Sequence, residues 1–364
     1  MKGRWLSLHR WVGLKLSILI SFVMITGTFA VISHEIDWLI DSGRRVSVSE
    51  APEHLDWQGL HDAARSARPE WAFTSLIAPI DPWHAAEVWG YNSNGEIRRL
   101  LFHPATFEFR GERAWFNAQR LFRDAHRRLM IPTFHGVVIV STLSILLAIS
   151  IVSGLYVYKK FWRGFFKKPR TRDARTLWGD LHRLGGIWSL WFTVIIALTG
   201  LFYLAESLGA RAARFDIKAP QSEPAPLVGS LTEYASRAKQ HLPDYDIALV
   251  GLPAFAGRPI EFYGQSKAIL VRDRANRVHF DSQTGAVVGV FDGRDATAWQ
   301  RVSEAADPLH FGTFGGIWTK LLYFVFGAIL SALSLSGVYI YSARIRKAAN
   351  RPTAVRPPAL PEAV

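Results

Sequence analysis

Four long apolar runs, separated by polar stretches, dominate the hydropathy pattern of the chain. They predict transmembrane helices over residues 1–34, 131–158, 181–205 and 309–343. Each run has roughly 20 apolar residues or more, enough to cross a hydrocarbon core of about 30 Å at 1.5 Å per helical residue. The first run is longer than the apolar part of an ordinary signal peptide, so we interpret it as a retained helix. The pattern therefore predicts a membrane α-helical protein.

The direction of the helices follows from lysine and arginine. These residues gather in the first ten positions, in the basic loop 159–180 and in the tail 344–364. Positive charge marks the cytoplasmic side, which predicts a multi-pass protein of the cell inner membrane with both termini in the cytoplasm. The net charge of +13 is then explained by topology and by attraction to anionic lipid of the bilayer. Nucleic-acid binding is not needed to explain it.

The two polar regions between spans, residues 35–130 and 206–308, are each long enough for a small domain with its own core. Both are predicted to lie in the periplasm as α+β domains, each with one helix on a small antiparallel sheet. The helices are expected at Trp57–Ala67 and after Ser230, which with Glu233 gives a capping-box pattern. Strand-like runs cover residues 73–78, 85–91 and 97–102 in the first region, and 247–252, 260–263, 268–271 and 286–291 in the second.

An internal repeat relates the two halves of the chain. The segment Leu-His-Arg occurs at residues 8–10 and again at 181–183, and Thr-Gly follows at the same spacing at 26–27 and 199–200. The ends of the second and fourth runs also match, at residues 153–158 and 336–341. The fold class is therefore four transmembrane helices in two span–domain–span repeats. Paired spans point the same way, so an axis near the membrane normal would bring equivalent residues to one depth.

At the cytoplasmic ends of the first and third spans, the repeat places an imidazole, a guanidinium and a glycine in each half. These residues are His9, Arg10, Gly13, His182, Arg183 and Gly186. The glycines follow the histidines by one helical turn and leave room for a flat macrocycle, and the arginines could bind haem propionates. Two imidazoles facing one iron would complete a haem site. The alternative is a pair of interfacial histidines with glycines for tight helix packing.

On the outer side, four histidines could hold a second haem. His126 and His310 are related by the repeat, and His310 is the firmer ligand. His135 competes with His126, because it lies deeper in the membrane and nine positions away, on roughly the opposite face of one continuous helix. His34, at the outer end of the first span, could pair with either. The chain has no cysteine, so any haem is held without covalent bonds.

These motifs give the chain a family resemblance that covers nearly its whole length. Residues 8–13 (Leu-His-Arg-Trp-Val-Gly) with residues 34–37 (His-Glu-Ile-Asp) resemble the start of the PepSY-associated transmembrane family of iron-regulated bacterial membrane proteins. Residues 309–316 resemble the start of the family's last helix, and residues 280–285 the closing turn of a PepSY domain. The corresponding segment of the first domain, residues 103–106, lacks the glycine. Both outer domains are therefore expected to be PepSY-like.

The resemblance implies a function. Some members resemble inner-membrane ferri-siderophore reductases with two b-type haems, and in such an oxidoreductase no catalytic residue is separate from the haems. The resemblance implies electron transport across the membrane to a periplasmic ferric siderophore, with release of ferrous iron. The electron donor stays open between a cytoplasmic reductase and a quinol.

Two other functions fit the same residues. The chain could be a haem-binding electron-transfer subunit for a separate periplasmic oxidoreductase. It could also be a haem-free regulatory or peptidase-inhibitory membrane protein, since PepSY domains resemble inhibitory propeptide segments. A transporter has little support, because no span has a charged centre or a broken apolar run.

Overall fold

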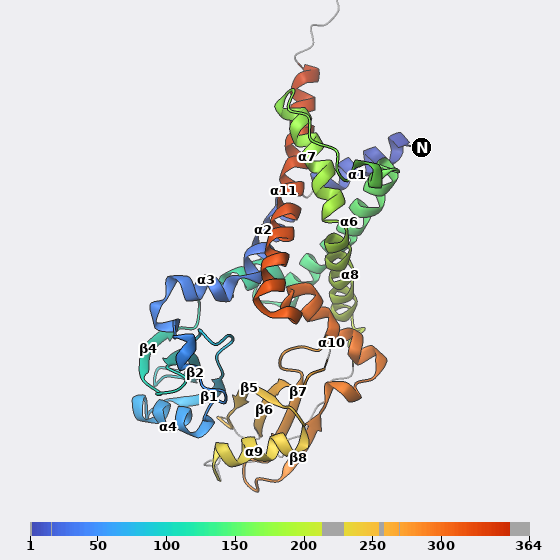
Figure 1. Cartoon of the computed structure of the whole chain (residues 1–364). Coiled ribbons are helices and arrows are strands. Elements are labelled where there is room, and N and C mark those ends of the chain that lie inside the picture. Colours follow the sequence, from blue (N-terminus) through green and yellow to red (C-terminus); the bar gives the residue numbers. More distant parts are fainter. Residues whose placement is uncertain (1, 16, 213–228, 255–257, 269, 350–364) are drawn as a thin grey trace, which may run out of the picture.

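The computed structural model describes residues 2–15, 17–212, 229–254, 258–268 and 270–349. A bundle of long helices stands on one side of a single β-sheet (Figure 1). Within the described residues, three helices are long and apolar enough to cross a membrane: Phe134–Val157, Leu190–Ser207 and Thr313–Arg346. The bent pair Gly3–Leu14 and Ser17–Val31, which turns by 68°, makes a fourth crossing if the pair is one span. The chain is a membrane protein with three or four candidate spans.

The α-helices are α1 (Lys2–Lys15), α2 (Ser17–Val31), α3 (Ser33–Ile40), α4 (Trp57–Ala67), α5 (Ala118–Arg128), α6 (Phe134–Val157), α7 (Ala174–Trp188), α8 (Leu190–Ser207), α9 (Leu231–His241), α10 (Ala298–Phe311) and α11 (Gly316–Ala349). The short 3-10 helices are η1 (Ser42–Arg44), η2 (Val48–Glu50), η3 (Phe161–Gly164), η4 (Gly293–Asp295) and η5 (Thr313–Gly315). Within each half, α1 packs on α6 and α7 packs on α11. Between the halves, α2 packs on α11 and α8 packs on α6, so the two repeats interlock.

The helices are more divided than the apolar runs predict. The predicted third span consists of α7 and α8, which are separated at Ser189. Its hydroxyl donates to the carbonyl of Gly185 at 2.7 Å, and such back-bonding favours a bend. The predicted fourth span is divided between α10 and α11, because Gly312 and Gly316 have positive φ angles of 70° and 62° and end the helical path there.

The segment that carries His126 and His135 is also divided. The prediction of one continuous helix through both residues is wrong, because α5 ends at Arg128 and α6 begins at Phe134. Leu129 and Met130 adopt left-handed backbone with φ of 56° and 61°, which no α-helix can continue. The two histidines therefore belong to different helices.

The strands are β1 (Ala72–Ile77), β2 (Ala86–Tyr91), β3 (Ile97–Phe102), β4 (Phe109–Ala114), β5 (Asp246–Gly251), β6 (Ile260–Gln265), β7 (Asn276–Phe280) and β8 (Val287–Phe291). They form one antiparallel sheet in the order β4-β3-β2-β1-β5-β6-β7-β8. The strands of the two outer regions meet where β1 pairs with β5, with Leu76 opposite Val250. The two predicted small sheets are thus fused edge to edge, which removes one exposed edge from each.

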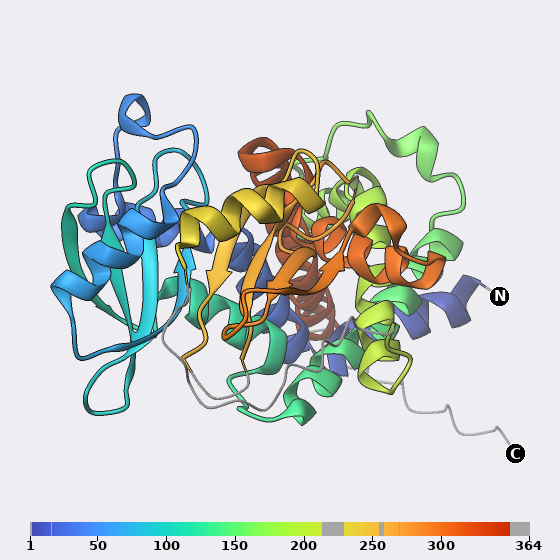
Figure 2. The ribbon, with the colours of Figure 1, turned by 90° about the horizontal axis from the view of Figure 1, so that it is seen from below.

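Helices α4 and α9 cover one face of this sheet, on the side away from the long helices (Figures 1 and 2). Their bounds agree with the two predicted helices, with Asp56 and Ser230 as the N-caps. Side chains from both halves, including Leu60, Phe102 and Phe262, form a single buried cluster under the two helices. The two regions therefore share one apolar core, where the sequence predicted a separate core for each.

The other face of the sheet points toward the long helices and carries polar side chains. On β2 the core residues Ala86 and Val88 alternate with Glu87 and Trp89, as the two-residue period of a strand requires. On β7 the residues Arg277 and His279 alternate in the same way with buried apolar neighbours. A polar surface thus lies between the core of the sheet and the membrane helices.

Candidate functional site

The histidines at the start of the two repeats face one another. His9 on α1 and His182 on α7 have ring centres 6.4 Å apart and ring planes at 84°. Helix α1 packs on α6 and helix α7 packs on α11, in each case the last span of the same repeat. The structure therefore brings together the two imidazoles that the sequence repeat paired.

Hydrogen bonds define which ring nitrogen of each histidine carries the proton. Nδ1 of His9 lies 3.1 Å from the hydroxyl of Ser153, and Nδ1 of His182 lies 2.9 Å from the hydroxyl of Ser336. Both hydroxyls donate to a backbone carbonyl of their own helix, at 2.6 and 3.2 Å. With the serine proton directed to that carbonyl, the imidazole donates from Nδ1 and keeps a lone pair on Nε2. Among the described residues, neither Nε2 atom has a hydrogen-bond partner.

These two rings line an inner cavity of about 530 Å³. Gly13 and Gly186 border the cavity, and a side chain built on either would meet no atom within 4 Å. Arg10 and Arg344 line the same cavity and form no ion pair with a carboxylate among the described residues. Cationic groups at the edge of an apolar cavity suit a flat ligand with acidic substituents. Arg183 also lines the cavity, but it pairs with Asp180 at 3.1 Å.

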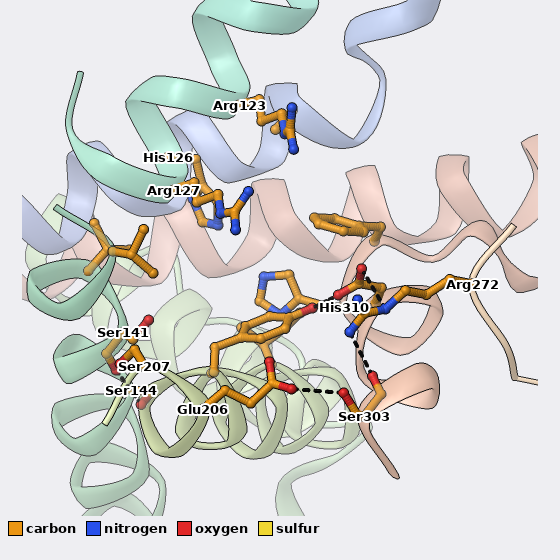
Figure 3. A pocket seen from close by; sticks show the side chains of 18 of the residues that line it. Arg123, His126, Arg127, Ser141, Ser144, Glu206, Ser207, Arg272, Ser303 and His310 are labelled. Atoms are coloured by element: carbon orange, nitrogen blue, oxygen red, sulfur yellow. Dashed lines mark hydrogen bonds and ion pairs between the residues drawn. The ribbon is translucent and has the colours of Figure 1, made fainter. Parts of the chain in front are cut away.

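A second pair of histidines lies nearer the sheet. His126 on α5 and His310 on α10 have ring centres 6.0 Å apart, with ring planes at 36° (Figure 3). Nδ1 of His126 donates to the carbonyl of Val23 at 2.9 Å. Nδ1 of His310 lies 2.8 Å from Oγ1 of Thr199, whose own proton goes to a carbonyl of α8 at 2.8 Å. Both outer rings therefore donate from Nδ1 and present the lone pair of Nε2, as the inner pair does.

Helix α5 is held in place by a buried carboxylate. Asp37 on α3 accepts hydrogen bonds from the backbone amides of Ala118 and Gln119 at 2.9 and 3.1 Å and from the side chain of Asn117. A carboxylate at a helix N-terminus satisfies free amide groups and is favoured by the helix dipole. This contact fixes the start of the helix whose last turn carries His126.

The outer pair lines a cavity of about 400 Å³ between α5, α6, α8 and α10. Arg123 and Arg127 line its α5 side, and the acidic side chains of α8 and α10 line the opposite side (Figure 3). On that side the hydroxyl of Tyr203 donates to Asp307 at 2.6 Å, and the Tyr203 ring packs edge-on against His310 at 5.2 Å. The outer cavity thus has one cationic wall for an acidic ligand group and one hydrogen-bonded wall that supports His310.

The remaining predicted ligands lie elsewhere. His135, at the start of α6, is exposed and its Nδ1 lies 3.4 Å from the hydroxyl of Thr133. His34 lies near Lys320, Glu87 and His84. The structure brings neither residue to the His126–His310 pair. Of the two outer alternatives left open by the sequence, the geometry favours His126.

The spacing of both pairs suits an iron atom between two imidazoles. An imidazole nitrogen binds a metal at about 2 Å, with the ring centre roughly 1 Å behind it, so two imidazoles holding one iron from opposite sides would have ring centres about 6 Å apart. In the described residues, no group of three or more His, Cys, Asp or Glu side chains could hold a bare metal ion. Two imidazoles with one lone pair each would suit a metal whose remaining ligands come from a cofactor. Both cavities have the size of pockets for a cofactor, about 300–1,000 Å³.

The two cavities adjoin inside the bundle. Met24, Leu143 and Leu147 line both of them. On α6, Ser153 contacts the inner pair and Ser144 lines the outer cavity, nine positions away. That separation is about 14 Å along a helix, and the intervening side chains of α6 are apolar apart from Ser150.

Sequence reasoning missed the residues that orient the histidines. Ser153 and Ser336 stand in the repeated segments that define the symmetry, and Thr199 precedes the repeated glycine. Their pairing with histidines from other helices depends on tertiary contacts, so only the repetition itself could have suggested them. Asp37 and Lys320 were equally detectable as ionisable residues beside or within an apolar run, which are usually functional.

Comparison with known proteins gives two matches. The sequence model of the PepSY-associated TM region matches residues 6–344. An uncharacterised protein of Pseudomonas aeruginosa is 24% identical over 255 residues, which are 62% of this chain and 63% of that protein. The chain thus spans less than two thirds of the length of this relative.

Proposed function

Because this chain belongs to the PepSY-associated transmembrane family, we propose that it is an electron-transfer protein of the inner membrane that holds two b-type haems. The inner haem would lie between His9 and His182, and the outer haem between His126 and His310. The N and C termini would lie in the cytoplasm and the sheet in the periplasm. The substrate would be a ferric siderophore, reduced on the periplasmic side with release of ferrous iron.

One observation carries the proposal: in all four paired imidazoles Nδ1 lies within 3.1 Å of an oxygen atom, an arrangement in which Nδ1 donates the hydrogen bond and Nε2 keeps its lone pair. A haem-ligating histidine needs its Nε2 lone pair, and a hydrogen bond from the other nitrogen fixes the ring and raises the basicity of the ligand. Histidines that merely cap helices or bind water have no reason to share one tautomer. The agreement across four rings on four helices therefore supports ligation.

The side chains around each histidine pair would bind the acidic groups of the haem and exclude water. When bound, each haem supplies reversible one-electron chemistry. Arg10 and Arg344 would hold acidic groups at the inner cavity, and Arg123 and Arg127 would do so at the outer cavity. The apolar side chains shared by the two cavities exclude water from the space between the metal sites.

The basic end of the molecule supports the proposed orientation in the membrane, and the sheet end supports the proposed substrate site. The described basic residues of the start of α1, of the 159–180 loop and of the end of α11 lie at the end of the bundle opposite the sheet (Figure 1). This arrangement supports a cytoplasmic location for that end. At the other end, Arg277 of β7 lines the outer cavity, so the polar face of the sheet adjoins it. A ferric chelate could bind there, and reduction would weaken hard oxygen ligands such as hydroxamates.

The test is reduction of a soluble chelate by the purified protein in vesicles. The protein is inserted with dithionite as electron donor on its basic side, and ferrioxamine with a ferrous-specific dye is supplied on the sheet side. We expect dye formation in the wild type and its loss in His182→Ala and His310→Ala, with His54→Ala as the exposed-histidine control.

Other results would select among the alternatives. Protein that contains haem but leaves the chelate unreduced would favour an electron-transfer subunit for a separate oxidoreductase. Protein that contains no haem when isolated from haem-supplied cells would contradict the proposal and favour a regulatory role.

A further inference from the structure

A second set of buried ionisable side chains lies outside both histidine pairs. Lys320 lies in the first turns of the candidate span Thr313–Arg346, and only 8% of its surface is exposed. Its Nζ atom binds Glu35 of α3 at 2.7 Å and lies 4.0 Å from Asp81 in the loop between β1 and β2. His84 of the same loop lies 3.9 Å from Asp81. We call Glu35, Asp81, His84 and Lys320 the Lys320 cluster.

Several polar atoms in the Lys320 cluster have no hydrogen-bond partner among the described residues. These atoms are Oε2 of Glu35, Oδ2 of Asp81 and both ring nitrogens of His84. His84 is 5% exposed, so water cannot freely solvate its ring. A buried polar group without a partner typically costs 1–3 kcal/mol, and such groups in native proteins usually have a functional reason. The missing partner here is one that can satisfy a carboxylate and an imidazole together.

The charges in the Lys320 cluster do not balance. Two carboxylates face one ammonium group, while a neutral His84 adds no charge. The other ionisable groups near His84 are His34 of α3 and Arg44 of η1. The charge of Arg44 is already offset by other carboxylates, because Arg44 pairs with Glu87 and lies 3.5 Å from Asp41. One negative charge is therefore left over, next to an imidazole that could carry a proton.

Burial lowers the pKa of His84, the charges of Asp81 and Glu35 act to raise it, and Lys320 and Arg44 lower it. The net direction is downward from the ordinary value. Burial therefore disfavours the charged form of His84, while a carboxylate is in place to stabilise it. An added negative charge nearby would raise the pKa of His84.

The Lys320 cluster breaks the internal repeat. The position equivalent to Lys320 in the first half is Val137, and the position equivalent to Glu35 in the second half is Leu208. The paired histidines, by contrast, occur in both halves. The Lys320 cluster is thus an addition to the symmetric scaffold, present in only one of the two equivalent places.

The Lys320 cluster can interact electrostatically with a group bound in the outer cavity. Asp273, whose charge is offset by Arg274, interacts electrostatically with both Lys320 and Asp307, and Asp307 lines the outer cavity. A unit charge at about 10 Å changes a buried group's energy by about 1.7 kcal/mol at an effective dielectric constant of 20. That interaction exceeds one pKa unit.

We propose that the Lys320 cluster is a proton-binding site that takes up one proton on His84 when an electron arrives at the outer cavity. This inference rests on the proposed function. The proton comes from the aqueous phase on the sheet side, and no bond other than the new N–H bond forms or breaks. The bound proton cancels the negative charge that the electron brings.

The test is the pH dependence of the midpoint potential of the outer haem in the full chain, measured from about pH 5.5 to about pH 8.5. In the wild type the potential should fall with rising pH, by up to about 59 mV for each tenfold drop in proton concentration. In His84→Gln the dependence should be lost. In Lys320→Met it should shift to higher pH by one unit or more, because the remaining carboxylates hold the proton more tightly.

The matched control is His279→Gln. His279 is also 5% exposed and has two unpartnered ring nitrogens, but the charge acting on it is that of Arg277 and not of a carboxylate. This variant should keep the wild-type dependence. Haem content is measured in every sample. A haem-loaded wild type whose potential does not change with pH overturns this inference alone, whereas a protein without haem overturns the proposed function with it.

Discussion

Ser153 and Ser336 occupy equivalent positions of the two repeats, and each accepts a hydrogen bond from the Nδ1 atom of one inner histidine. The two contacts are 3.1 and 2.9 Å long and join helices that are far apart in sequence. The repeat therefore conserves within one molecule both an imidazole and the group that orients it. Such orienting groups are as characteristic of metal sites as the ligands are.

Removing these hydroxyls should weaken the inner site. In Ser153→Ala and Ser336→Ala the Nδ1 proton loses its acceptor. The ring is then free to rotate, and its Nε2 atom is a weaker ligand for iron. We expect haem to bind the inner site about 10- to 100-fold more weakly, as measured by haem transfer to apomyoglobin. Ser334→Ala is the control, because Ser334 lines the same cavity but bonds to Ser21 at 2.7 Å. Equal haem retention in all three variants would contradict the role of the two serines.

A methyl group at Gly27 should disturb the outer site alone. An added Cβ would lie 2.6 Å from Cε1 of His126, which forces the ring away from His310. We expect Gly27→Ala to lose the outer haem and keep the inner one, as resolved by redox titration. Gly154→Ala is the matched change at the inner site, where the Cβ would lie at an ordinary 3.6 Å from His9. Loss of haem from Gly154→Ala as well would refute this steric account.

Replacing the buried carboxylate under α5 should loosen the helix that carries His126. Asp37→Ala leaves the amides of Ala118 and Gln119 without their acceptor, which should lower the free energy of unfolding by about 2 kcal/mol. The outer haem should therefore be released at a lower temperature than the inner haem, followed by absorbance during heating. Asp62→Ala, a change at an exposed position on α4, should leave both release temperatures unchanged.

The two sites should differ in their electron paramagnetic resonance spectra. The inner rings are nearly perpendicular, at 84°, and the outer rings are inclined at 36°. Ring orientation splits the iron d orbitals, so the oxidised protein should give two low-spin signals, with the larger anisotropy from the inner site. His9→Ala should remove the more anisotropic signal and His126→Ala the other. The reverse assignment, or one signal for both sites, would contradict this geometry.

Much of the histidine arrangement followed from the repeat. His9 and His182, and His126 and His310, were paired by spacing alone, and an axis relating two interlocked halves brings each pair together. The choice between His126 and His135 could not be made in this way. It depends on the left-handed residues Leu129 and Met130, which break the helix without any glycine or proline to signal the break.

The sheet was harder to predict. The alternation of buried and polar residues located β1, β2 and β3, and helix α4 begins at its capping Asp56. Strand β7 was missed, and the run expected at 268–271 is not a strand among its described residues, with residue 269 outside them. Strand β4 has no buried residue and so no pattern to detect. The fusion of the halves through β1 and β5 is a contact between distant segments, which local patterns do not encode.

The central claim is that each haem iron is shared by one histidine from each half of the molecule. Its most direct test is the haem-to-protein ratio, with reduced-minus-oxidised spectra, in the wild type, His9→Ala, His182→Ala and the double variant. We expect a ratio of about two in the wild type and about one in all three variants, since the loss of either ligand empties the same site. A ratio that stays near two in both single variants would contradict the shared inner site.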